Sequence, residues 1–275
     1  MNEVVKYENR INTLPLVGFS SVELNLFMLL CAKAKDRGQD LIVLEYGKLK
    51  RQLGLEKQTD KYFHGELYKM ADKLSKIHCN FKNENEFVVF NLFSTFTGNL
   101  ENRTLTVRVN IDFQYLLNEL AKNFTLFELQ EFVQLESKYS KNLYRLLKQY
   151  RRTGTYTVEA NKFRELMDCP KSYANMYFMR DCVGVAVKEL SHGYFEDLKV
   201  EPIRAKKRGA PIIAYTFTFQ KSKQIPGQQR IDDYQEPAPE TPAPAPKRQP
   251  KKKENSFNNF PQRDYDFDEL EKRLL

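Results

Sequence analysis

The stretch SKYSKNLYRLLKQYRRTG, residues 137–154, holds six basic residues and no acidic one. At 100° per residue, five of them fall on one narrow stripe of a helix, beside a face of leucine and tyrosine. This basic stripe consists of Lys138, Lys141, Arg145, Lys148 and Arg152. Stripe neighbours three and four residues apart repel one another, and a polyanion would relieve that repulsion. The stripe therefore predicts contacts with phosphates, and the competing interpretation is an ordinary solvated helix face.

A second candidate for binding is the helical pattern over residues 172–190. One face is predicted to be buried, and it consists of Met176, Met179, Val183, Ala186, Val187 and Leu190. The other face and its N-terminal approach carry Lys171, Ser172, Tyr173, Asn175, Tyr177, Arg180 and Lys188. A recognition helix meets DNA with its N-terminal turns, Asn and Arg suit adenine and guanine edges, and Tyr, Ser and Lys suit phosphates. The competing interpretation is the polar face that any amphipathic helix has.

A basic turn follows this helix between two β-rich runs. The sequence RAKKRG contains Arg204, Lys206, Lys207 and Arg208. At the tip of a hairpin next to a recognition helix, such a turn predicts contact with phosphates or with the minor groove.

The residue pattern argues against catalysis. The chain has three histidines, at positions 64, 78 and 192, and they do not have the spacing of metal ligands. The sequence contains no Gly-rich phosphate loop and no G-x-S-x-G elbow. Its four cysteines are scattered without a C-x-x-C pair, which disfavours a zinc site or a disulfide scaffold and fits a reducing cytoplasm. We therefore expect no enzyme activity, no metal and no cofactor.

Length and charge favour a nucleic-acid partner. The chain has 275 residues and a net charge of +8, and residues 221–275 are nearly neutral, so the surplus lies in residues 1–220. No signal peptide or apolar run long enough for a membrane span is visible, so we expect a cytoplasmic protein. Residues 221–275 hold eight of the twelve prolines and predict a disordered tail, which ends in the amphipathic segment DYDFDELEKRLL.

The order of predicted elements occurs twice. A helix over 20–37 precedes a strand over 41–46, a short helix from 47, a longer helix over 59–77 and a hairpin formed by runs 86–96 and 103–109. The same order follows from residue 137 to residue 219. We therefore predict an α+β, mainly helical fold of two tandem winged-helix domains, residues 1–125 and 126–220, before the tail 221–275.

The sequence resembles one family of DNA-binding proteins. LESKYSKNLYRLLKQYRRTGTYTV, then FRELM and FMRDCVGVAVKEL, are similar to the iteron-binding plasmid replication initiators, as is FSSVELNLFMLLCAKAK with LIVLEYGKLKRQL. The resemblance covers about residues 10–220. It implies a non-enzymatic initiator whose monomer binds direct repeats at the origin, helps to open the duplex and recruits the host initiator and helicase. It also implies a dimer that represses its own gene and controls plasmid copy number.

Within the resemblance, the second domain contributes the main sequence-reading helix, and the first contributes backbone contacts and dimerisation. A tandem winged-helix transcriptional repressor remains an alternative, which the DNA beside the gene would decide. A rolling-circle nicking initiator needs a pair of histidines for its metal, and this sequence lacks that pair.

Overall fold

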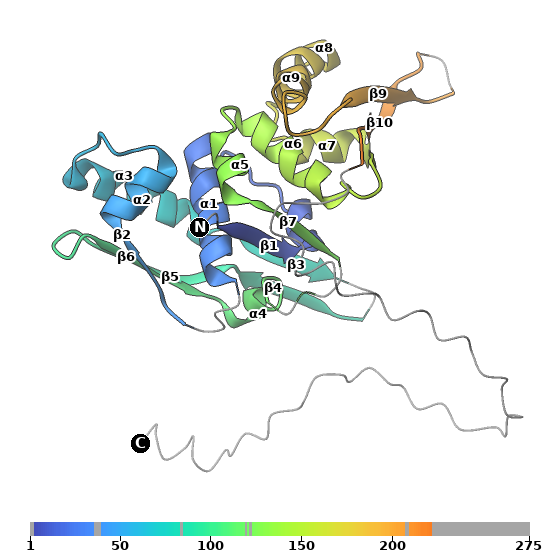
Figure 1. The fold of residues 1–275 in the computed structure, drawn as a ribbon. Coiled ribbons are helices and arrows are strands. Elements are labelled where there is room, and N and C mark those ends of the chain that lie inside the picture. Colours follow the sequence, from blue (N-terminus) through green and yellow to red (C-terminus); the bar gives the residue numbers. More distant parts are fainter. Residues whose placement is uncertain are drawn as a thin grey trace, which may run out of the picture. The chain divides into compact units, whose positions relative to one another are not determined.

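The computed structural model describes residues 3–35, 40–82, 85–118, 120, 123–206 and 209–221, all within one compact unit. The predicted disordered tail, residues 221–275, lies outside the described residues except for Lys221. Among the helices of the described part, none has the length and apolar character needed to cross a membrane. We refer to residues 3–135 as the N-terminal half and to residues 136–221 as the C-terminal half (Figure 1).

The N-terminal half builds a helix-turn-helix on a small sheet. Its helices are the 3-10 helix η1 (Asn9–Thr13), α1 (Ser21–Ala34), α2 (Tyr46–Leu53), α3 (Asp60–Ser75), α4 (Ile111–Gln114) and α5 (Leu129–Gln134). Its strands are β1 (Val4–Glu8), β2 (Ile42–Glu45), β3 (His78–Lys82), β4 (Phe87–Asn91), β5 (Phe93–Asn99), β6 (Thr104–Val109) and β7 (Phe124–Glu128). A capping box of Ser20 and Glu23 starts α1, and Gly54 ends α2 in the left-handed conformation.

The C-terminal half repeats the arrangement. It consists of α6 (Lys138–Gln149), β8 (Thr155–Glu159), α7 (Ala160–Leu166), α8 (Asn175–Tyr177), the π-helix η2 (Phe178–Gly184), α9 (Val185–Leu190), β9 (Lys199–Arg204) and β10 (Ile212–Thr218). Ser137 caps α6 by accepting a hydrogen bond from the N–H of Tyr139.

The two halves have the same sheet topology. In the N-terminal half the strand order is β2-β6-β5, and in the C-terminal half it is β8-β10-β9, with antiparallel pairing throughout. In each half the strand before the helix-turn-helix pairs with the second strand of the hairpin that follows it. This repeat of helix, strand, two helices and hairpin confirms the prediction of two tandem winged-helix domains with mixed helix and strand content.

Two strand pairs were not predicted. β1 pairs antiparallel with β7, with Val5 opposite Phe127, and β3 pairs with β4, with Cys79 opposite Phe90. The predicted hairpin of runs 86–96 and 103–109 is therefore correct only for β5 and β6, because residues 87–91 pair with β3 instead. The boundary predicted at residue 125 falls inside β7 and stays a prediction.

Helix α6 lies where the two halves meet. It packs against β7 and α1 on one side and against α9 on the other, as Figure 1 shows. By position in the repeat, α6 is the counterpart of α1, whose residues 24–31 are all buried. In α6 the residues from Ser140 to Leu147 are buried in the same way. The central helix of each unit is therefore covered on all sides.

Candidate nucleic-acid interface

The structure buries most of the basic stripe. Lys141 and Arg145 are 0% exposed, and the side chain of Lys148 is 11% exposed. Phosphates cannot reach Lys141 and Arg145 in this fold, so the predicted phosphate contacts are wrong for these two residues, and Lys148 is mostly buried. At the two ends of the stripe, Arg152 is exposed and Lys138 is partly exposed.

The buried cations bind backbone carbonyls and a carboxylate instead of phosphates. Arg145 donates from Nη1 and Nη2 to the carbonyl oxygens of Ile11, at 3.2 Å, and Leu14, at 3.0 Å. The Lys141 Nζ donates to the carbonyl oxygens of Phe132, at 2.5 Å, and Val133, at 3.3 Å. These two carbonyls belong to the last turn of α5, where helix geometry leaves carbonyls without partners. The stripe thus joins α6 to the N-terminal half.

Burial also changes the acid–base behaviour of these groups. Burial lowers the pKa of Lys141 to about 7, and the negative charge of Glu189 acts in the opposite direction. Burial likewise lowers the pKa of Lys148, while the ion pair of its Nζ with Glu131 Oε2, at 2.7 Å, raises it. A charged group without water needs hydrogen-bond partners, and the carbonyls and Glu131 supply them.

The candidate recognition helix runs from α8 through η2 to α9, and we call residues 171–190 the recognition segment. Its buried side chains are Phe178, Cys182, Val183, Ala186 and Leu190. The predicted buried face is confirmed for Val183, Ala186 and Leu190, whereas Met179 and Val187 are only partly buried and Met176 is 64% exposed.

The π-helical turn explains the shifted face. A wide turn adds one residue to the helix, so buried positions before it move back by one, from Met179 to Phe178. A Cβ at Gly184 would lie 2.9 Å from the carbonyl oxygen of Met179, which any real side chain avoids. Glycine at this position therefore permits the wide turn.

The predicted polar face of the recognition segment is at the surface. Lys171, Ser172, Asn175, Tyr177, Arg180 and Lys188 are exposed, and Tyr173 is partly buried. Arg164 of α7 donates to the Tyr173 carbonyl oxygen at 2.9 Å and to Asn175 Oδ1 at 2.8 Å, and its guanidinium lies 4.4 Å from the Phe178 ring centroid. These contacts fix the start of the helix. They involve Oδ1 of Asn175 and not its amino group.

Arg180 is held in a defined orientation on this face. Its Nε and Nη2 donate to Asp181 Oδ1 and Oδ2 at 2.5 and 2.9 Å, and its guanidinium carbon lies 5.2 Å from the Tyr177 ring centroid. The hydrogen bonds from Arg180 lower the pKa of Asp181, which keeps that carboxylate ionised. The Nε and Nη2 atoms of this exposed guanidinium are therefore both bonded to Asp181.

The wing of the C-terminal half is the β9–β10 hairpin. Arg204 and Lys206 are exposed on it, and Arg204 donates to the carbonyl oxygen of Ala210 at 3.1 Å. Gly209 has a φ of 82°, which suits the tight return of the chain. Lys207 and Arg208, which we also predicted as contact residues, lie outside the described residues.

Sequence reasoning missed the equivalent surface of the N-terminal half. The second helix of its helix-turn-helix, α3, exposes Lys61, Tyr62, Tyr68 and Lys69, and Tyr68 is 73% exposed. Large exposed aromatics beside lysines are unusual on a helix that only packs inward, and they suit contact with a nucleic-acid backbone. The internal repeat was the signal that could have identified them, because α3 occupies the place of the recognition segment.

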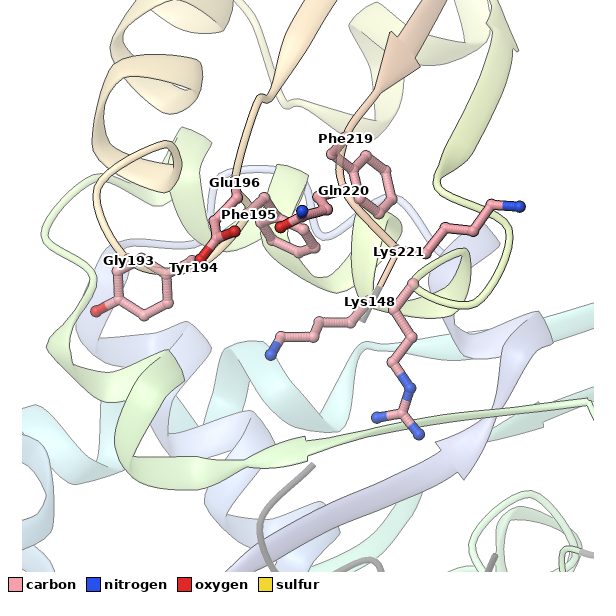
Figure 2. Close-up of a pocket in the computed structure, with 9 residues that line it drawn as sticks. Lys148, Gly193, Tyr194, Phe195, Glu196, Phe219, Gln220 and Lys221 are labelled. Carbon is pink, nitrogen blue, oxygen red and sulfur yellow. The ribbon is translucent and has the colours of Figure 1, made fainter. Parts of the chain in front are cut away.

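A cavity of about 200 Å³ lies at the end of α6. Figure 2 shows its lining, which comes from the end of α6, the loop after α9 and the chain after β10. Two of its cations already have protein partners, since Lys148 binds Glu131 and Arg151 donates to the carbonyl oxygen of Leu126 at 3.2 Å. The cavity is therefore part of the junction between the two halves.

Comparison with known proteins agrees with this architecture. Residues 4–148 match the family model described as Initiator Replication protein, WH1, and residues 159–219 match the model described as Initiator Rep protein, WH2. A curated relative from Bifidobacterium longum (strain NCC 2705), "Probable replication protein rep", is 32% identical over 219 residues, covering 79% of this chain and 73% of the relative.

A solved structure has the same fold. It is the "Crystal structure of Pi initiator protein in complex with iteron DNA", with a TM-score of 0.60 and 16% sequence identity, covering 81% of this chain and 99% of that one. The two family models together span both winged-helix units described above. This chain belongs to the family of plasmid replication initiator (Rep) proteins.

Proposed function

We propose that the chain binds directly repeated sites in double-stranded DNA at a plasmid origin and acts there as a non-enzymatic initiator. The C-terminal half reads the sequence, and the N-terminal half contributes backbone contacts. The observation that carries the proposal is the recognition segment, with its exposed Asn, Arg, Tyr and Lys side chains beside a basic wing. Family membership and the fold shared with an initiator described as bound to iteron DNA support it.

Each part of the surface has a proposed role. Asn175 and Arg180 contact base edges, and the wing residues with Lys171, Ser172, Tyr173, Tyr177 and Lys188 contact the backbone. From the basic stripe, Arg152 and Lys138 keep the proposed phosphate contact. The exposed side chains of α3 contact the phosphate backbone of an adjacent DNA segment, and they are Lys61, Tyr62, Tyr68 and Lys69.

Dimerisation is proposed for the N-terminal half. Strand β4 exposes Phe87, which is 73% exposed, together with Val88 and Val89. Exposed apolar side chains along a two-stranded hairpin favour pairing with another strand. A second copy of the chain would supply that strand in the autorepressing dimer.

The first prediction is a footprint on the DNA that flanks the gene. We expect protection of tandem direct repeats, with binding about 10³-fold or more tighter than to a scrambled duplex of equal composition at the same salt concentration. Protection confined to a single inverted site at the promoter would instead favour the transcriptional repressor. Equal binding to repeat and scrambled DNA would refute the proposal.

Arg180→Ala tests the base-reading role within the same assay. We expect a loss of about 1–3 kcal/mol on the repeat, relaxed preference at one base position and little change on scrambled DNA. The matched control is Lys188→Ala, which removes a proposed phosphate contact and should weaken both duplexes similarly. Equal losses on both duplexes for Arg180→Ala would assign that residue to the backbone.

Origin melting, host recruitment and autorepression also belong to the proposal. The acidic start of DYDFDELEKRLL disfavours DNA as its partner, so we propose that this segment binds a host replication protein. Deleting residues 222–275 should leave DNA binding intact, because the family models end at residue 219, and should lower plasmid copy number. Unchanged copy number would exclude the tail from recruitment.

A further inference from the structure

Asp168 connects the two halves of the molecule. It lies just after α7, two residues before Pro170, and has a φ of 51°. Its Oδ2 accepts a hydrogen bond from the Gly18 N–H at 3.0 Å and one from the Lys138 Nζ at 2.7 Å. Gly18 belongs to the loop before α1, so this carboxylate joins the approach to the recognition segment directly to the N-terminal half.

The other side of the same glycine contacts the candidate DNA helix of the N-terminal half. The Gly18 carbonyl oxygen accepts a hydrogen bond from the Nζ of Lys73 on α3 at 2.7 Å. Lys73 also pairs with Glu23 Oε2 at 2.8 Å, and Glu23 is fixed by the N–H of Ser20 at the start of α1. Gly18 therefore links the two: its carbonyl oxygen binds α3, and its N–H binds Asp168.

A second carboxylate holds the recognition segment from its far end. Glu189, in the last turn of α9, accepts hydrogen bonds from the N–H groups of Glu136 at 2.6 Å and Ser137 at 3.4 Å. These amides precede α6 and belong to the C-terminal half, so Glu189 holds the end of the recognition segment within its own half. Asp168, by contrast, accepts a hydrogen bond from a backbone amide of the N-terminal half.

We infer that Asp168 is a positioning residue that fixes the orientation of the recognition segment relative to α3. The inference rests on the proposed function, because the consequence is a fixed spacing between the two DNA segments that the two halves contact. Binding of both halves to a duplex with a different spacing requires the halves to reorient, and the Asp168–Gly18 hydrogen bond is one of the junction contacts that must then break, together with those of α6. Breaking this hydrogen bond in advance by mutation should therefore make binding less sensitive to spacing.

The test compares Asp168→Gly with Asp168→Asn on two duplexes. One duplex carries the repeat located by the footprint, and the other carries it with two base pairs inserted between its protected segments, which rotates them by about 70°. Both substitutions remove the same charge, and both residue types accept the positive φ. Only Asn keeps a side-chain oxygen that can accept a hydrogen bond from the Gly18 N–H. The difference between the two variants therefore reports the effect of this hydrogen bond.

The measured quantity is the ratio of the Kd values on the inserted and the native duplex. We expect this ratio to be roughly five-fold smaller for Asp168→Gly than for the unmodified protein, the effect of about one net hydrogen bond. For Asp168→Asn, we expect a ratio close to that of the unmodified protein. A general loss of folding or of charge would change both Kd values together and leave the ratio unchanged.

Lys73→Met provides a second variant should Asp168→Gly not fold. It removes the hydrogen bond between α3 and the Gly18 carbonyl oxygen and should reduce the ratio in the same direction. Ratios equal to that of the unmodified protein in both variants would overturn the positioning role. Failure of the unmodified protein to protect the repeat would instead overturn the proposed function, so the two failures are distinguishable.

Discussion

Replacing Arg145 by alanine should lower the free energy of unfolding by about 3 kcal/mol and the Tm by roughly 6–12 °C. The guanidinium is fully buried, and its loss removes the donor to the Leu14 carbonyl oxygen and leaves the Ile11 carbonyl oxygen with the Leu14 N–H. Each buried carbonyl that loses its partner costs about 1–3 kcal/mol, and the vacated volume adds a cavity cost. Urea denaturation of the DNA-free protein measures the effect.

Two further substitutions separate the contributions. Arg145→Met fills most of the volume without donating, so the difference between Met and Ala reports packing alone. Arg152→Ala, at the exposed end of the same stripe, should change stability by less than about 0.5 kcal/mol and reduce the slope of log affinity against log salt by about one. If Arg145→Ala kept full stability and reduced the salt slope instead, the residue would face phosphates after all.

Local signals in the sequence predicted the repeated fold well. The Ser20–Glu23 capping box and the left-handed Gly54 mark helix ends through contacts between near neighbours, which a sequence pattern contains. The repeated order of elements then predicted two winged-helix units. Strand pairs between distant segments were missed, because β1 and β7 lie about 120 residues apart and nothing in either run specifies its partner.

The pattern of charges in the basic stripe did not predict the binding partners of its cations. Periodicity placed five cations on one line, but a cation is satisfied equally by phosphate, carboxylate or carbonyl oxygen. The partners of Arg145 are backbone carbonyls more than 130 residues away, which have no sequence signature. Comparison with α1 would have corrected the prediction, since residues 24–31 of that helix are apolar apart from Asn25 and are expected to be buried.

The position of the recognition segment was predicted correctly, but the residues on its buried face were only partly predicted. An α-helical period of 3.6 residues assigns Met176 and Met179 to the core, whereas the π-helical turn brings Phe178 and Cys182 there. Wide turns are rare enough that periodicity alone does not indicate them. The residues predicted on the polar face are nevertheless exposed, except Tyr173, which is partly buried.

Lys141 should make folding stability depend on pH near neutrality. Its pKa is lowered to about 7 in the folded protein, whereas an unfolded lysine keeps a pKa near 10.4. Below pH 7 the side chain is charged in both states, and the full cost of burying the charge is present. As the pH rises above 7, the folded state loses the proton and the unfolded state keeps it, so this cost disappears and the free energy of unfolding increases.

Between pH 7 and 8.5 the increase from this group approaches about 2 kcal/mol, because each pH unit contributes up to about 1.4 kcal/mol. Unfolded cysteines such as Cys79, whose pKa in the folded protein is raised by burial to about 12, also ionise as the pH approaches 8.5, and comparison with the variants separates their contribution. Lys141→Met should remove the slope in this window, although the carbonyls of Phe132 and Val133 then lose their donor.

The control is Lys48→Met on α2, whose side chain is 65% exposed and in water in both states, so the slope should remain. Subtracting each variant's profile from that of the unmodified protein removes the titration of every other group, provided that Glu189 keeps its hydrogen bonds to residues 136 and 137. A slope that survives Lys141→Met would show that another group titrates there. A slope lost in both variants would show that surface charge is responsible, and it would contradict a buried ammonium at the C-terminus of α5.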